Sequence, residues 1–174
     1  MWSVLSSTTL PRLATLAVAA TLLAAPLDRS AVADSGPFAA LPGDWSGTGK
    51  IRVQGQNAER LRCKATYRST GSTQHDVNLR LACDSDSYKF DLTGDFTADA
   101  SNNISGRWTE SSRNVGGTAI GTVQGDRFQI HIESSAFAAN MELVTRGTRQ
   151  AVTFDAHGGG QVVDSSITLN RGAR

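Results

Sequence analysis

Two stretches of the sequence decide the fold: Leu61-Arg62-Cys63-Lys64-Ala65-Thr66-Tyr67 and Val77-Asn78-Leu79-Arg80-Leu81-Ala82-Cys83. Apolar and polar residues alternate along both, which is the pattern of a half-buried β-strand. A turn at residues 71–74 pairs the two strands in the register that keeps their apolar residues on one face. The facing pairs are then Cys63 with Cys83, Ala65 with Leu81, and Tyr67 with Leu79. Cysteines directly opposite each other lie at the separation that a disulfide requires, so the sequence predicts a disulfide-linked hairpin.

The beginning of the chain is typical of a secretory signal peptide. Residues 1–33 contain Arg12, an apolar run from Leu13 to Leu27, and the small-x-small cleavage pattern Ala31-Val32-Ala33. The apolar run is shorter than the roughly 20 residues that span a bilayer. We therefore expect a periplasmic or secreted protein, and an exported chain with an even number of cysteines favours the disulfide.

Residues 34–174 have the length of a single domain with one core. Alternating runs separated by turn residues continue to the end of the chain, and no long stretch has a helical period. About eight to ten strands at this spacing, each close in sequence to the next, predict an all-β fold, a small antiparallel up-and-down barrel. We expect residues 34–42 to be a loose lead-in. Short strands and mid-strand Arg and Lys residues on the outer face argue against a membrane-spanning barrel, and we expect a monomer.

The first predicted strand begins with Gly43-Asp44-Trp45, which has the Gly-x-Trp form found at the same place in lipocalins and other calycin-type barrels. The resemblance implies that Gly43 and Trp45 form the barrel floor. It also implies a basic side chain from a late strand packed on the tryptophan, a role that Arg149 or Arg171 could fill. Gly47 and Gly49 follow on the same face, where they would allow a sharp bend or a close approach of another backbone.

Two groups of bacterial proteins also resemble this chain. Small exported proteins of bacteria share a pattern like Trp45-Ser46-Gly47, Arg62-Cys63, Cys83, Tyr88-Lys89-Phe90-Asp91-Leu92 and Ile104-Ser105-Gly106-Arg107-Trp108. This likeness covers most of residues 34–174 and implies no activity. Periplasmic metalloprotease inhibitors resemble the chain in plan, as small eight-stranded barrels with Gly-x-Trp and one disulfide, although their cysteines are placed differently. They supply the alternative hypothesis, in which residues 34–41 insert into a protease.

Two sets of residues are candidate binding sites. Four aromatic residues are expected to face the barrel interior, where they form the core or line a cavity enlarged by inward glycines: Tyr67, Tyr88, Phe90 and Trp108. Seven cations are expected to point outward from three adjacent strands and form a basic face: Lys50, Arg52, Arg60, Arg62, Lys64, Arg68 and Arg80. Such a face serves solubility or attracts an anionic partner.

Motifs for catalysis, metal binding or cofactor binding are not found in the sequence. His75, His131 and His157 have no partner at metal-ligand spacing, and no phosphate-binding or nucleophile motif occurs in a strand-to-helix context. The sequence lacks a platform of exposed aromatic residues for nucleic acid. We therefore expect a non-enzymatic binding protein of the cell envelope, without cofactor or metal. Its partner would be a small apolar molecule in the barrel, or an anionic envelope component or protein on the basic face.

Overall fold

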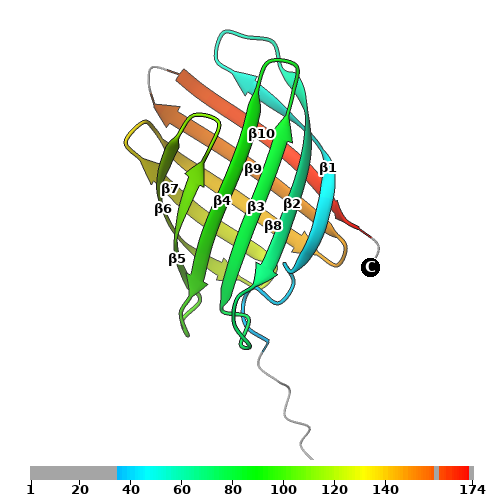
Figure 1. Cartoon of the computed structure of the whole chain (residues 1–174), viewed down its shortest axis with the longest axis vertical. Coiled ribbons are helices and arrows are strands. Elements are labelled where there is room, and N and C mark those ends of the chain that lie inside the picture. The colour runs from blue at the N-terminus through cyan, green and yellow to red at the C-terminus, as the bar shows by residue number, and fades with distance from the viewer. Residues whose placement is uncertain (1–34, 159–160, 173–174) are drawn as a thin grey trace, which may run out of the picture. The chain divides into compact units, whose positions relative to one another are not determined.

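The computed structural model describes residues 35–158 and 161–172, and the predicted signal peptide lies outside them. Within the described residues the chain forms ten strands: β1 (Gly43–Val53), β2 (Glu59–Ser69), β3 (Asp76–Asp84), β4 (Lys89–Ala98), β5 (Asn103–Glu110), β6 (Val115–Gln124), β7 (Arg127–Ser134), β8 (Ala138–Arg146), β9 (Arg149–Gly158) and β10 (Gln161–Arg171). Each strand pairs antiparallel with the next, and β1 pairs with β10 to close the barrel (Figure 1). The predicted all-β up-and-down barrel is confirmed.

The hairpin of β2 and β3 has the predicted register. Cys63 lies opposite Cys83, and the two form a disulfide with a Cα–Cα distance of 4.1 Å. Both cysteines are almost fully buried. The alternation of apolar and polar residues fixed this register, because a slip by one residue would turn every apolar side chain of the strand to solvent.

The glycines of β1 allow β10 to approach closely where the barrel closes. A Cβ atom added at Gly47 would lie 1.9 Å from the backbone oxygen of Thr168, and one at Gly49 would lie 2.2 Å from that of Ser166. Real Cβ atoms do not come this near, so a side chain at either position would force the two backbones apart. The close approach expected of these glycines is confirmed.

Strand length differs from the sequence-based expectation. The strands are eight to eleven residues long, because alternation continues into polar segments such as Thr93 to Ala98 at the end of β4. Strand length therefore no longer distinguishes this barrel from a membrane barrel. No helix in the described part of the chain is long and apolar enough to cross a bilayer.

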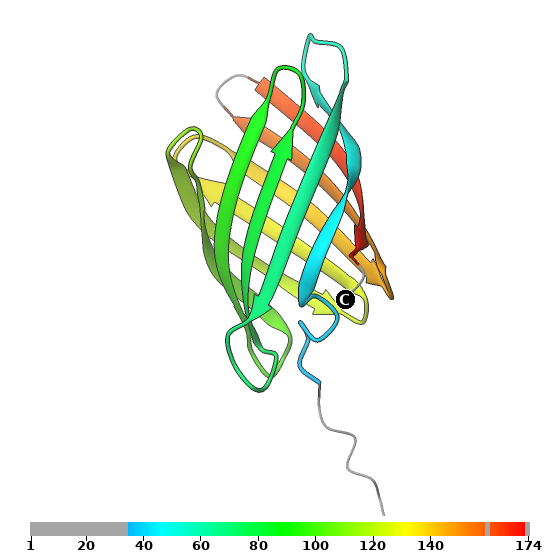
Figure 2. The same ribbon diagram turned by 45° about the vertical axis from the view of Figure 1, so that its right-hand side comes forward.

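The two ends of the barrel differ. Residues 35–42 and the β2–β3, β4–β5, β6–β7 and β8–β9 connections lie at one end, here called the floor end. The β1–β2, β3–β4, β5–β6 and β7–β8 connections lie at the other, here called the mouth end. Figures 1 and 2 show the N-terminal segment reaching the floor end in both views.

Candidate functional site

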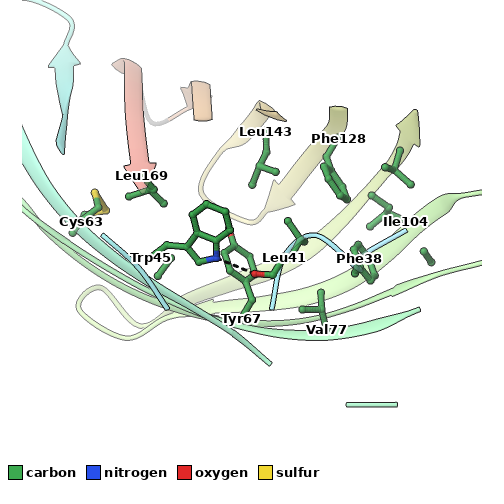
Figure 3. Packing of buried hydrophobic residues seen from close by; sticks show 14 of the residues in the cluster. Phe38, Leu41, Trp45, Cys63, Tyr67, Val77, Ile104, Phe128, Leu143 and Leu169 are labelled. Carbon is green, nitrogen blue, oxygen red and sulfur yellow. Dashed lines mark hydrogen bonds between the residues drawn. A yellow bond between two sulfur atoms is a disulfide. The ribbon is translucent and has the colours of Figure 1, made fainter. Parts of the chain in front are cut away.

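The floor end is sealed by the N-terminal segment. Phe38 and Leu41 are each only 3% exposed, inside the ring of strand ends. The Phe38 ring stacks on the Phe128 ring with centroids 6.0 Å apart, and the Trp45 indole N–H donates a hydrogen bond of 2.9 Å to the Leu41 carbonyl (Figure 3). The expectation of a loose lead-in is wrong, because burial of these two apolar side chains holds the segment in the barrel.

Arg171, the last residue of β10, also holds this segment. Its guanidinium carbon lies 4.4 Å from the centroid of the Trp45 ring, and its N–H groups donate to the carbonyls of Pro42 and Ala40. Arg149, the other residue considered for this role, is exposed and lies opposite Asn170. The basic side chain over the tryptophan is therefore that of Arg171, near the C-terminal end of the last strand.

A buried polar network lies beside the N-terminal segment that seals the floor end. Gln150 is fully buried, accepts a 3.0 Å hydrogen bond from the Tyr67 hydroxyl, and donates one to the Thr145 hydroxyl. Burial raises the pKa of Tyr67, so this phenol stays protonated at neutral pH. Tyr67 was a candidate ligand-binding residue, but the structure places it in the floor, where its polar atom is already occupied.

The middle of the barrel is less filled than the floor. Nine apolar side chains there face inward, because their neighbours along each strand take the solvent-facing positions. All nine are only half-buried: Leu79, Leu81, Leu92, Phe96, Ile130, Met141, Val152, Phe154 and Ile167. The floor residues Trp45, Phe128 and Leu169 are 1 to 3% exposed. These side chains still pack against the buried cluster of the floor, as Leu81, Ile130 and Val152 do. The barrel is therefore tightly packed at the floor, and its inward apolar side chains are more accessible above it.

The other three aromatic candidates lie toward the mouth end. Trp108 is 5% exposed, donates its indole N–H to the Thr118 carbonyl at 3.2 Å, and packs on Phe137. Tyr88 and Phe90 are half-buried, and the Tyr88 hydroxyl donates to the Gln56 side chain. Trp108 thus forms a filled part of the wall, whereas Tyr88 and Phe90 remain accessible.

A cation at the mouth end was missed by the sequence analysis. The guanidinium carbon of Arg113 lies 4.7 Å from the centroid of the Phe90 ring, and its N–H group donates to the Lys89 carbonyl. Arg113 belongs to the four-residue β5–β6 turn and forms an ion pair of 3.5 Å with Glu110. The β4–β5 register, which sets Leu92 opposite Glu110, brings this turn over Phe90.

Glu110 is a buried acid that serves the same turn. Burial alone would raise its pKa, but backbone N–H groups of Asp91, Ser112 and Arg113 donate to its two oxygens and together lower the pKa below its usual value. The carboxylate is therefore charged and acts as an acceptor for a tight turn. With no proton to give and no free oxygen, Glu110 is unsuited to acid–base chemistry.

The basic face has the placement expected from the sequence. All seven side chains are exposed on β1, β2 and β3. Arg62 pairs with Asp84 at 2.8 Å, and Arg68 pairs with Asp44 at 3.3 Å. Lys50 and Arg60 lie directly opposite each other in the β1–β2 register.

The remaining candidates for a site are metal-binding clusters, the histidine His131 and surface hollows. Residues 35–158 and 161–172 contain no group of three His, Cys, Asp or Glu side chains placed to hold a metal. His131 contacts Asn140 and Glu133, and the hydrogen bond with Asn140 is the main reason that its pKa is raised. Two open hollows lie outside the barrel, one between Pro37 and Asn102 at the floor end and one on the outer wall near Asp95 and Arg107. Both are shallow, and neither gathers reactive groups.

Comparison with known proteins identifies relatives by fold alone. No protein-family model matches the chain, and no curated protein is similar in sequence. Among solved structures, the S-type phycobiliprotein lyase CPES from Guillardia theta superposes with a TM-score of 0.62 at 12% identity, over 79% of this chain and 91% of that chain. Rv2717c from M. tuberculosis superposes with a TM-score of 0.63 at 12% identity, over 77% of this chain and 94% of that chain. The chain shares their fold. With the ten-stranded barrel, this supports the resemblance to calycins at the level of architecture.

Proposed function

We propose that the protein is a non-enzymatic binding protein that holds a small apolar molecule inside its barrel. The observation that carries the proposal is the half-burial of inward apolar side chains above a sealed floor, as at Ile130, Val152 and Ile167. Apolar surface left accessible inside a closed barrel gains free energy when an apolar ligand covers it, by about 25 cal/mol per Å². Ligand sites of this kind are concave, mostly apolar and largely preformed.

The lining favours binding over catalysis. Glu110, Thr145 and Gln150 are buried polar side chains, and they and the Tyr67 hydroxyl have their hydrogen bonds within the fold. Most of the accessible inward side chains of the described strands are apolar, which supports a binding role. One of the solved structures that share this fold is a lyase by name. At 12% identity the fold likeness does not carry that activity to this chain.

The alternative function, inhibition of a periplasmic protease, has less support. That hypothesis needs residues 34–41 as a free segment that enters a protease, whereas Phe38 and Leu41 are buried in the floor. An envelope or secreted location remains part of the proposal. The buried disulfide is consistent with an oxidising compartment.

The experiment is a titration with N-phenyl-1-naphthylamine, a neutral apolar fluorophore. The parent protein should bind it saturably, with one molecule per barrel. Val152→Trp should abolish or strongly weaken binding, because Val152 faces the interior between Leu143 and Ile167. Thr153→Trp adds the same side chain to the outer face of the same strand and should bind as the parent does. Absence of saturable binding, or equal effects of both substitutions, would overturn the proposal.

A further inference from the structure

The charge of the outer wall is concentrated on three strands. Outward positions of β1–β3 carry the seven cations of the basic face and three acids, Asp44, Asp76 and Asp84, a net charge of +4. Described outward positions of β4–β10 carry five cations, Lys89, Arg107, Arg127, Arg146 and Arg149, and six acids, Asp91, Asp95, Glu133, Glu142, Asp155 and Asp164. One side of the barrel is thus strongly positive and the rest nearly neutral.

The centre of this positive side is an uncompensated pair. Lys50 and Arg60 face each other across the β1–β2 ladder, and both are exposed. Among residues 35–158 and 161–172, no carboxylate lies within ion-pair distance of either side chain. Like charges directly opposite each other destabilise an antiparallel pair. The arrangement costs stability, and an anion bound between the two side chains would remove the repulsion.

The pair lies toward the mouth end. Lys50 is three residues from the end of β1, and Arg60 is the second residue of β2, so both are near the β1–β2 connection that borders the mouth (Figure 1). The described outer wall presents one large exposed hydrophobic side chain, Ile120, which lies on β6. The surface around Lys50 and Arg60 is therefore polar and suited to phosphate groups rather than to lipid chains.

We propose that Lys50 and Arg60, supported by Arg62 and Lys64, dock the barrel onto an anionic phospholipid surface. The choice of a membrane rests on the proposed function: an apolar ligand partitions into lipid, and a mouth held beside a membrane shortens the path between lipid and barrel. Basic side chains near an anionic bilayer are attracted additively, and the attraction falls off within a Debye length of about 8 Å at physiological salt.

The test is co-sedimentation with phosphatidylglycerol vesicles and with phosphatidylcholine vesicles. The parent should bind the anionic vesicles, bind them less at higher salt, and ignore the neutral ones. Lys50→Ser/Arg60→Ser should weaken binding by about tenfold or more, because two surface cations are lost. Arg107→Ser/Arg149→Ser removes the same charge from β5 and β9 and should leave binding nearly unchanged.

Three results would overturn the docking proposal. These are equal weakening by the two double variants, no binding to anionic vesicles at low salt, and binding to the soluble polyanion dextran sulfate without binding to vesicles. The neutral fluorophore titration separates this proposal from the proposed function. Lys50→Ser/Arg60→Ser should bind N-phenyl-1-naphthylamine as the parent does, so either proposal can fail while the other holds.

Discussion

The guanidinium group of Arg171 stacks on the buried ring of Trp45, with the guanidinium carbon 4.4 Å from the ring centroid. These residues come from the last and the first strand, so the contact lies across the seam where the barrel closes. Because Arg171 also donates to the Pro42 carbonyl, it joins the seam to the segment that seals the floor. The Arg171 side chain thus contacts both the closing seam of the barrel and the N-terminal segment that seals the floor.

Loss of this side chain should destabilise the protein. A partly desolvated cation–π contact contributes about 0.5–2 kcal/mol, and hydrogen bonds from a charged group contribute about 1.5–3 kcal/mol each. We expect Arg171→Ala to lower the free energy of unfolding by about 2–4 kcal/mol, measured by urea denaturation. Arg149→Ala, a matched loss of charge at an exposed position of the neighbouring strand, should change it by less than about 0.5 kcal/mol. Equal effects would show that Arg171 does not hold the floor.

The Tyr67 hydroxyl gives the protein a stability that depends on alkaline pH. Burial raises the pKa of Tyr67 above its unfolded value of about 10. The folded state therefore holds the phenol proton more tightly, and this stabilisation is complete below pH 10 and is lost as the pH rises above it. We expect the free energy of unfolding of the parent to fall above about pH 10 more steeply than that of Tyr67→Phe.

At neutral pH the same substitution should be unfavourable. Tyr67→Phe leaves the buried Gln150 oxygen without its donor, at a cost of about 1–3 kcal/mol. Tyr88→Phe is the control, because the Tyr88 hydroxyl bonds to the exposed Gln56. A parallel pH dependence in Tyr67→Phe and the parent would contradict the buried environment of this phenol.

The disulfide should stabilise the hairpin without determining the fold. Closing a loop with a sequence separation of 20 contributes about 3 kcal/mol in the chain-entropy model. We expect Cys63→Ala/Cys83→Ala to lower the melting temperature while the β-sheet circular dichroism is retained, and dithiothreitol to lower that of the parent but not of the double variant. Two free thiols in the purified parent would refute the pairing.

The alternation of apolar and polar residues predicted the features of the fold that depend only on adjacent strands. The register of Cys63 with Cys83 follows from the alternation of apolar and polar residues. The close approach of β10 at Gly47 follows from the absence of a side chain there. Alternation does not indicate how far along the barrel axis an inward side chain lies. It placed Tyr67 and Phe90 on one inner face, although Tyr67 lies in the sealed floor and Phe90 near the mouth.

The floor itself could not be read from the sequence. Phe38 and Leu41 stand in a segment without periodicity, and they are buried only because the ten strands close around them. Arg113 illustrates the same limit at the mouth, since its position over Phe90 depends on a turn that Glu110 holds through backbone hydrogen bonds. These contacts join parts of the chain whose local patterns are independent.

The central claim is that the barrel interior is an apolar binding site, and Met141 offers the most direct measurement. The chain has two methionines, Met1 and Met141, and Met141 faces the interior between Ile130 and Phe154. In protein labelled with ¹³C at the methionine methyl groups, adding N-phenyl-1-naphthylamine should shift the Met141 resonance saturably at one molecule per barrel. Val152→Trp should suppress that shift, and Thr153→Trp should preserve it. A Met141 resonance that does not move while the probe binds would place the ligand outside the barrel and contradict the account.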